Sequence, residues 1–399
     1  MHIGYWCPAW PLEKFQNGII TYVHWMKREL EGRGHRVSIF TEGEEQTPGD
    51  PQVHHVHPGL RDRALRRLSR MWQPSEFNVF DYSAVIASGI LRVHRRDPID
   101  IIEMEESFGW SADIARRTSL PLLVKLHGPA FLTMPDEERN SAFGREKVER
   151  EGNALRAANA IISPSNWALT RTVEHYGLTP KETGQINNPI GVDTDMPLWR
   201  LEACERNTIL FVGRFDKIKG ADVLLHAFYS LLRRRPDARL IFIGPDLGVP
   251  GPDGLPILFE AYCKLHFPAD FRDSVDFRGR MPIREVAKLR TRAMVIVTAS
   301  RSENQPYAVL EAMLQGCPVV TTDAGGCPEI VADGTTGLLA KSQDSEDFAR
   351  GILTMLEKPE LSAAMGQAAR RHVIAHYSPA TVAGASIKMY ERVIANSIR

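Results

Sequence analysis

Two glutamates, Glu303 and Glu311, stand eight positions apart in the segment SENQPYAVLEAMLQG, the second within an otherwise apolar stretch. Pro306 suits the first position of a helix, and Gly316 suits the end of that helix after Gln315. The free N–H groups and the dipole at a helix start favour a phosphate, and a carboxylate accepts hydrogen bonds from sugar hydroxyls. The pattern therefore predicts a ligand with hydroxyl groups on both sides of a diphosphate, such as a nucleotide sugar.

A second pattern, LFVGRFDKIKG, places two cations after an apolar strand. Arg214 directly follows the strand end at Gly213, and Lys219 comes five residues later, just before Gly220 and a helical segment. At the carboxyl end of a strand, an arginine can hold a diphosphate by a two-pronged contact and a lysine as a point charge. The alternative is a solvated turn with incidental charges, and this segment alone leaves both interpretations open.

These residues need a scaffold, and the apolar pattern indicates one. Short apolar runs alternate with segments of helical period, beginning with a strand at 2–7, a helix at 18–34 and a strand at 35–41. This order predicts parallel strands. Further strands are predicted at 100–104, 121–128 and 160–165, and then at 208–214, 238–245, 274–280, 293–300 and 317–323.

The alternation restarts after a turn-rich patch, which predicts two doubly wound αβα domains of Rossmann type facing each other across a cleft. A bisubstrate site would lie in that cleft. The expected limits are a first domain at 1–193, a linker at 194–206, a second domain at 207–375 and a final helical segment at 376–399.

Three motifs follow one another in the second half of the chain: GRFDKIKG at 213–220, ENQPYAVLEAMLQGCPVV at 303–320 and DAGGCPEIVADGTTG at 323–337. Their order and spacing resemble the donor-binding domain of the family 4 retaining glycosyltransferases. The segment at 15–41 is similar to the glycine loop and first helix of that family. The resemblance implies the GT-B fold, with an acceptor-binding first domain, a nucleotide-sugar-binding second domain and a last helix that crosses back to the first domain.

The resemblance also implies roles for single residues. Arg214 and Lys219 would bind the donor diphosphate, and Glu311 would accept hydrogen bonds from the ribose hydroxyls. Glu303 would lie beside the transferred sugar, and His127, in VKLHGP, near the reacting sugar. The implied catalytic residues are thus His127, Glu303, Arg214 and Lys219. The other implied donor-binding residues are Gly18, where the backbone would approach the phosphates, Arg280, near the nucleobase, and Asn304, Gln305, Pro306 and Tyr307.

One segment departs from the family pattern. Where many members have Gly-aromatic-Gly after the first glutamate, this chain has Asn304, Gln305 and Pro306. Proline has no backbone N–H, so the set of backbone donors to sugar and phosphate must differ here. We expect this segment to help decide which donor sugar is bound.

Two further segments have two open interpretations each. Glu103, Glu105 and Glu106 follow a predicted strand and could line the acceptor side, or they could be solvated loop carboxylates. The segment at 60–72 carries five arginines among apolar residues at near-helical spacing. It could lie on an anionic membrane surface, or it could be a solvated helix packed on the first domain.

Two patterns imitate metal sites. The DTD sequence at 193–195 falls in the interdomain stretch, where we expect a structural role. His54, His55 and His57 lack a matching cluster of partners and stand in a stretch rich in Pro and Gly, so we expect a surface loop there. The sequence therefore predicts no metal site.

The composition excludes several classes of protein. Apolar residues make up 43 % and charged residues 25 % of the chain, which is typical of a folded globular protein. The 49 basic residues balance the 49 acidic ones, so no overall field attracts nucleic acid. The five scattered cysteines and an amino-terminal segment without the features of a secretion signal favour a cytoplasmic protein. It would be peripheral on the inner membrane face if 60–72 binds lipid.

Together these patterns predict a retaining glycosyltransferase that moves a hexose-type sugar from a UDP- or GDP-linked donor to a hydroxyl acceptor. The acceptor would be a glycan, a glycolipid or a small molecule, and no metal or other cofactor is expected. Charge on the leaving diphosphate would be stabilised by Arg214, Lys219 and the helix start near Pro306. The alternatives are a non-catalytic nucleotide-sugar-binding protein of this fold, or another GT-B enzyme such as a sugar-nucleotide epimerase or a phosphorylase.

Overall fold

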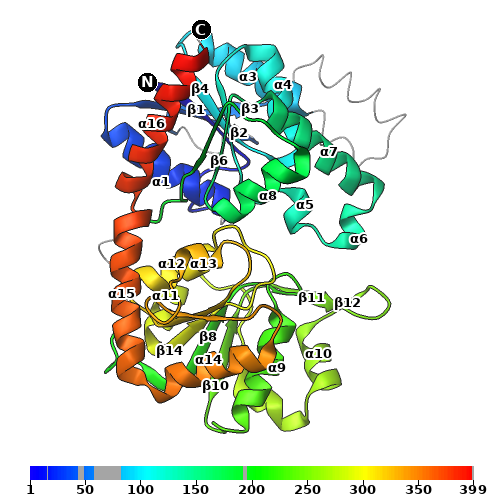
Figure 1. The fold of residues 1–399 in the computed structure, drawn as a ribbon, viewed down its shortest axis with the longest axis vertical. Coiled ribbons are helices and arrows are strands. Elements are labelled where there is room, and N and C mark those ends of the chain that lie inside the picture. The colour runs from blue at the N-terminus through cyan, green and yellow to red at the C-terminus, as the bar shows by residue number, and fades with distance from the viewer. Residues whose placement is uncertain (16, 44–48, 58–81, 192–195, 398–399) are drawn as a thin grey trace. The chain divides into compact units, whose positions relative to one another are not determined.

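The computed structural model describes the chain except for residues 16, 44–48, 58–81, 192–195 and 398–399. The chain divides into two compact units (Figure 1). The first unit holds Met1–Pro189 and Pro379–Arg399, and the second holds Ile190–Ser378. Each unit is built on a parallel sheet flanked by helices, which confirms the predicted α/β class.

The sheet of the first unit has the strand order β3-β2-β1-β4-β5-β6-β7, and every neighbouring pair in it is parallel. Its strands are β1 His2–Cys7, β2 Arg36–Glu42, β3 Val53–Val56, β4 Ile101–Glu105, β5 Leu122–Lys125, β6 Ala160–Ser163 and β7 Glu182–Gln185. The prediction of a surface loop around His54 and His55 is wrong. Both residues belong to β3, which pairs with β2 in the parallel sheet.

The helices of the first unit cover both faces of this sheet. They are α1 Gly18–Gly32, α3 Ser83–His94, the short 3-10 helix η2 Ser107–Gly109, α4 Trp110–Thr118, α5 Ala130–Thr133, α6 Asp136–Arg139, α7 Ala142–Ala157, α8 Asn166–Tyr176 and α16 Pro379–Ser397. Residues of α1 and α16 share one hydrophobic core with Tyr5 and Leu123 of the sheet, whereas Trp6 and Val124 point into a second core with α3 and α4. This alternation is the mark of a strand buried on both faces.

The last helix belongs to the first unit although it ends the chain. Figure 1 shows α16 lying along α1, and the two helices pack on each other. The start of α1 is fixed by Asn17, whose side chain accepts the Ile19 N–H at 2.8 Å. The chain leaves the first unit near residue 189 and re-enters it at Pro379.

The second unit holds a sheet in the order β13-β10-β8-β14-β15-β16, also parallel throughout, and a small sheet in the order β12-β11-β9. The strands are β8 Glu205–Val212, β9 Phe215–Asp216, β10 Arg239–Ile243, β11 Asp246–Pro250, β12 Pro256–Ile257, β13 Val275–Phe277, β14 Ala293–Val297, β15 Val319–Thr322 and β16 Leu338–Ala340. All five strands predicted for this half are present.

The helices of the second unit are α9 Ala221–Leu232, α10 Phe259–His266, η3 Ala269–Ser274, α11 Ile283–Arg292, α12 Tyr307–Leu314, α13 Cys327–Ile330, α14 Ser345–Glu357 and α15 Pro359–Tyr377. Helix α14 packs on α9 and on β14, β15 and β16. Helices α11 and α12 contact β14, and α15 packs on α12. One large core joins these elements.

Among the described residues, no helix combines the length and the apolar character needed to cross a membrane. The arginine-rich segment at 60–72 and the DTD sequence at 193–195 lie outside the described residues. Contact of 60–72 with a membrane therefore stays a prediction.

Candidate active site

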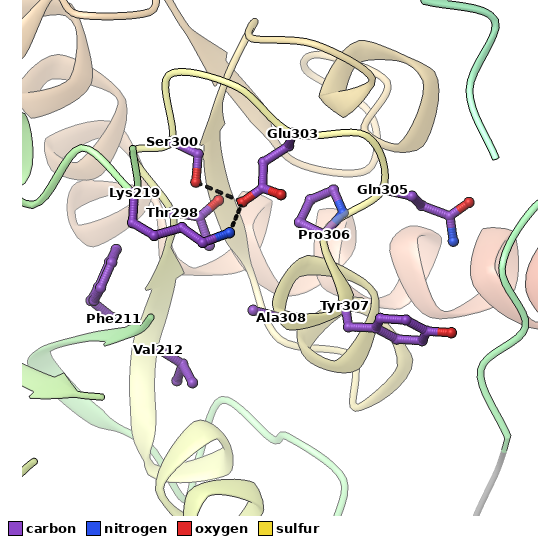
Figure 2. Close-up of a pocket in the computed structure, with 10 residues that line it drawn as sticks. All are labelled: Phe211, Val212, Lys219, Thr298, Ser300, Glu303, Gln305, Pro306, Tyr307 and Ala308. Carbon is purple, nitrogen blue, oxygen red and sulfur yellow. Dashed lines mark hydrogen bonds and ion pairs between the residues drawn. The ribbon is translucent and has the colours of Figure 1, made fainter. Parts of the chain in front are cut away.

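In the second unit, a pocket of about 300 Å³ lies beside the carboxyl ends of β8 and β14 and the start of α12 (Figure 2). Carboxyl ends of neighbouring parallel strands meet at one edge of a sheet, and ligands of open α/β sheets bind at that edge. The lining residues are Phe211, Val212, Lys219, Thr298, Ser300, Glu303, Gln305, Pro306, Tyr307 and Ala308. Half of them are residues that the sequence predicted for donor binding.

Lys219 and Glu303 form an ion pair in this pocket. The Lys219 ammonium and the Ser300 hydroxyl both donate to Glu303 Oε1, the hydroxyl at 2.9 Å, and Figure 2 shows the two donors converging on this oxygen. No residue in the described part of the chain bonds Glu303 Oε2. The Lys219 and Glu303 side chains are 28 % and 14 % exposed, so a ligand in the pocket can reach both groups.

Asp216 couples the two predicted phosphate-binding cations. Its Oδ2 accepts from Arg214 Nε at 2.6 Å, and its Oδ1 accepts the backbone N–H of Lys219 at 2.7 Å. Arg214 does not line the pocket, and its side chain is 44 % exposed. The remaining guanidinium nitrogens of Arg214 can therefore approach an anion from solvent while Asp216 fixes the turn.

The glycines of the DAGG motif hold the Glu303 loop in place. The Gly326 N–H donates to the Glu303 carbonyl at 2.9 Å. Gly325 adopts a φ of +62°, and a Cβ there would lie only 2.0 Å from that same carbonyl oxygen. A side chain at Gly325 is therefore excluded both by backbone conformation and by space.

Helix α12 begins next to the pocket, as predicted, and Gly316 with a φ of +78° follows its end. Pro306 is the residue before the helix, not its first residue, and its carbonyl accepts the N–H groups of Val309 and Leu310 at 3.2 and 3.3 Å. Asn304 is buried and does not line the pocket. In Figure 2 the Gln305 and Tyr307 side chains extend away from the Lys219 ammonium.

Glu311 has a packing partner that the sequence did not suggest. Arg290 of α11, whose side chain is only 5 % exposed, forms an ion pair with the Glu311 carboxylate. Gln315 accepts from Arg290 Nη1 at 3.4 Å and donates to the carbonyls of Pro197 and Ala287. Glu311 therefore has a packing role within this apolar helix, because it neutralises a buried guanidinium. Its carboxylate stays 35 % exposed and can still meet a ligand.

Glu103, Glu105 and Glu106, at the end of the predicted strand at 100–104 and just beyond it, are buried, so the alternative of solvated loop carboxylates is wrong. Glu103 lies on β4, and its Oε2 accepts from the Tyr390 hydroxyl of α16 at 2.5 Å. Tyr390 in turn bonds the Tyr5 hydroxyl at 2.6 Å. Glu103 thus ties the last helix to the centre of the sheet rather than standing in a loop.

Glu105 and Glu106 lie at the carboxyl end of β4. Glu105 accepts from the Ser107 hydroxyl at 3.0 Å, and burial beside the Glu106 carboxylate raises the pKa of Glu105 to about 7. Glu106 accepts two backbone N–H groups, from His127 at 2.9 Å and from Gly128 at 2.6 Å. Whether these carboxylates touch an acceptor stays a prediction.

His127 is the second residue after β5 and is half-buried. Its ring meets the Tyr22 ring edge-on, with 5.4 Å between centroids. Burial, assisted by the Lys125 ammonium, lowers the pKa of His127 to about 3, so the imidazole is neutral at ordinary pH. Lys125 is itself buried, donates to the Ile186 carbonyl at 2.8 Å, and has a pKa lowered to about 8 by burial.

Two other predicted residues do not line the pocket. Gly18 is the first residue of α1 in the first unit and is exposed. Arg280 is exposed, follows the edge strand β13 and does not line the pocket. In the described part of the chain, no group of three or more His, Cys, Asp or Glu side chains could hold a metal ion.

Sequence patterns alone did not identify Ser300, Asp216 or Arg290 as residues that shape these sites. They indicated Glu106, but not as a residue that supports a loop. Asp216 stands inside the quoted motif GRFDKIKG, so its short distance from Lys219 was a usable signal. Arg290 is one of several arginines in a helical stretch and carries no local signal.

Comparison with known proteins shows which family models the chain matches. The model described as glycosyl transferases group 1 matches residues 200–372, and the glycosyl transferase 4-like domain matches residues 17–189. The D-inositol 3-phosphate glycosyltransferase of Streptomyces scabiei is 28 % identical over 376 residues, covering 89 % of this chain and 82 % of that protein.

Solved structures show the same fold. Sucrose-phosphate synthase from Thermosynechococcus elongatus has a TM-score of 0.76 at 20 % identity and covers 99 % of both chains. Anabaena HepE in complex with UDP and glucose has a TM-score of 0.68 at 18 % identity, covering 98 % of this chain and 100 % of that one.

The two family models define a glycosyltransferase, and the two parallel-sheet units together with the solved structures show the GT-B fold. Within that class, the chain belongs to the glycosyltransferase 4-like family, whose two domain models together span 17–189 and 200–372. The predicted family, fold and glycosyl transfer from a nucleotide sugar are confirmed.

Proposed function

We propose that this enzyme transfers a hexose-type sugar from a UDP- or GDP-linked donor to a hydroxyl acceptor, with retention at the anomeric carbon and without a metal ion. The observation that carries the proposal is the convergence of Lys219 and Ser300 on Glu303 beside the start of α12. A cation and a helix start suit the diphosphate. A carboxylate with one oxygen still available suits a sugar hydroxyl.

The leaving group sets what the residues must do. When the bond between the anomeric carbon and the phosphate oxygen breaks, negative charge grows on the diphosphate, and Lys219, Arg214 and the α12 start would stabilise it. The acceptor oxygen forms the new bond on the same face, and its proton passes to the departing phosphate. Glu303 would hold the sugar rather than attack it. These fixed positive groups could supply the stabilisation that a divalent cation gives in other enzymes.

A neutral His127 suits the family role near the reacting sugar. With its pKa lowered to about 3, the imidazole offers one N–H donor and one acceptor nitrogen at neutral pH. It would therefore bond a sugar hydroxyl without adding charge. Glu311 would take the ribose hydroxyls through the exposed part of its carboxylate.

The relatives support the substrate classes. One is named for D-inositol 3-phosphate, a polyol phosphate, and a structural neighbour was solved with UDP and glucose. We therefore place UDP-glucose first among donors and polyols or their phosphates first among small acceptors. Glycan and glycolipid acceptors remain to be compared with them.

The test is release of nucleoside diphosphate from UDP-glucose, UDP-N-acetylglucosamine and GDP-mannose, with and without inositol 3-phosphate or another hydroxyl acceptor. Release that requires an acceptor, continues in EDTA and gives an anomer of unchanged configuration by NMR supports all parts of the proposal. Inversion or complete loss in EDTA overturns the corresponding part.

The same assay separates the alternatives. A binding protein would be stabilised by UDP or GDP against heat without turnover, an epimerase would convert the donor without an acceptor, and a phosphorylase would need inorganic phosphate. The Glu303→Gln variant isolates the charge of that carboxylate. Wild-type activity in this variant would refute an essential role for the Glu303 charge.

A further inference from the structure

The Glu106 carboxylate makes a contact that the proposed mechanism does not use. Glu106 is 1 % exposed, and its two oxygens accept the backbone N–H groups of two successive residues, His127 and Gly128. A carboxylate bonded to two adjacent amides fixes both the position and the direction of that backbone. The loop that follows β5 is therefore anchored to the end of β4.

The backbone after Glu106 is itself tightly determined. Phe108 has a φ of 58°, in the left-handed region that non-glycine residues rarely adopt. Gly109 follows with a φ of 66°, and a Cβ there would lie 2.3 Å from the Arg150 carbonyl oxygen. The Phe108 ring stacks on Trp110 with 4.9 Å between centroids. Strained backbone held by such packing concentrates at functional sites.

The buried carboxyl groups near this loop make a purely structural role costly in stability. Glu105, Glu106 and Glu151 are all buried, and none of them forms an ion pair among the described residues. Glu151 bonds the Ala130 N–H at 2.8 Å, farther along the same loop. Buried carboxylates without a paired cation cost stability, and apolar side chains would fill this space more favourably. The arrangement points to a demand on the loop other than stability.

We propose that Glu106 is a positioning residue for glycosyl transfer, which fixes the His127–Gly128 backbone and thereby the place of the His127 imidazole. This inference rests on the proposed role of His127 near the reacting sugar. Glu106 acts through His127 and need not touch the substrate. Its carboxylate holds the loop after β5 through the hydrogen bonds from the His127 and Gly128 amides.

A double-mutant cycle tests this inference. The four proteins are wild type, Glu106→Gln, His127→Ala and the double variant, assayed with the donor and acceptor that the screen selects. Glu106→Gln keeps the shape of the side chain but turns an N–H₂ group toward one of the two amides. We expect kcat to fall about tenfold with the donor KM and the affinities for UDP and GDP nearly unchanged, since the donor pocket is untouched.

Glu151→Gln is the comparison variant, because Glu151 is as deeply buried but bonds only Ala130. If lost stability alone slowed the enzyme, Glu151→Gln with a similar fall in Tm would be as slow as Glu106→Gln. We expect kcat of Glu151→Gln to stay within about threefold of wild type.

The double-mutant cycle distinguishes failure of the proposed role of His127 from failure of the positioning role of Glu106. Wild-type turnover in His127→Ala would refute the proposed role of His127 itself. Slow His127→Ala together with wild-type turnover in Glu106→Gln would refute the positioning role alone. An equal fall from Glu106→Gln in both backgrounds would place its action elsewhere, whereas the inference requires little further loss once His127 is absent. If Glu106→Gln does not fold, Glu106→Asp, which keeps the charge but is too short to span both amides, takes its place in the cycle.

Discussion

Two groups of glutamates in this enzyme experience opposite surroundings. In the second unit, Glu303 faces Lys219 and Glu311 faces Arg290, and both carboxylates keep some exposure. In the first unit, Glu105, Glu106 and Glu151 are buried, form no ion pair within the described part of the chain, and bond hydroxyl or backbone N–H groups instead.

The difference shows how a carboxylate can serve a ligand or a backbone. A paired and partly exposed carboxylate can exchange its cation for sugar or ribose hydroxyls, because water and ligand reach it. A buried carboxylate bonded to amides cannot move without leaving those amides unpaired. We infer that the second unit presents glutamates to the donor, whereas the first unit uses them to shape loops.

The largest effect is expected when the ion pair between Arg290 and Glu311 is broken. Glu311→Ala leaves the Arg290 guanidinium buried without its partner, so we expect a loss of about 3 kcal/mol in the free energy of unfolding by denaturant. Glu357→Ala, which removes an exposed carboxylate at the end of α14, should change it by less than about 0.5 kcal/mol.

The double variant Arg290→Met with Glu311→Leu sharpens this point. It should recover most of the stability, because no charge is then buried alone, yet it should still bind UDP and GDP weakly if Glu311 holds the ribose. Recovery of both properties would assign Glu311 a structural role only.

The next largest effect concerns the ion pair between Lys219 and Glu303. Lys219→Ala removes a charged contact to the diphosphate, and we expect kcat/KM to fall about a hundredfold, equivalent to about 2.7 kcal/mol. Lys217→Ala is the matched control, since Lys217 is an exposed lysine of the same turn that does not line the pocket. Equal rates in the two variants would mean that the diphosphate is not bound by Lys219.

A smaller effect should follow from moving Glu303 without changing it. Gly325→Ala places a Cβ against the Glu303 carbonyl and must shift that loop, so we expect kcat/KM to fall about tenfold. Gly334→Ala is an unusually close control, because Gly334 has a similar φ of +70° but nothing within 4 Å of an added Cβ. Both variants carry the same backbone strain, and only Gly325→Ala should lose activity beyond its loss of stability.

The smallest effect concerns the buried carboxylates and pH. Burial raises the pKa of Glu151 to about 8 and that of Glu105 to about 7. Between pH 6.5 and 8 these two carboxyl groups hold protons in the folded chain that they have released in the unfolded chain, so their contribution to stability falls as pH rises. Groups whose pKa is lowered on folding, such as His127 and Lys125, contribute in the opposite direction, so the difference between wild type and Glu151→Gln isolates the carboxyl group.

We expect Glu151→Gln to reduce this fall by about 1 kcal/mol between pH 6.5 and 8. The measurement is thermal unfolding of the whole chain at several pH values in that range. An unchanged pH dependence in Glu151→Gln would show that Glu151 is ionised throughout.

Local pattern predicted the elements well, for a physical reason. Helix α9 follows the apolar spacing of ADVLLHAFYSLL, and α12 begins beside Pro306 and ends before Gly316 as expected. The strands β8, β10 and β14 coincide with continuous apolar runs, because parallel strands are covered on both faces. Local pattern was a poorer guide where the apolar runs are weak. His54 and His55, expected in a surface loop, lie on the edge strand β3, and no strand was predicted where β11 and β12 form.

By itself, the sequence determined the α/β class, the order of the elements and the positions of Lys219 and Glu303 after predicted strands, because these follow from local apolar spacing and turn residues. Only the tertiary structure decided that Arg290 neutralises Glu311 and that Glu106 supports the amides after β5. Those contacts join separate segments whose relative positions depend on how helices and strands pack. Neither spacing nor residue type within one segment contains that information.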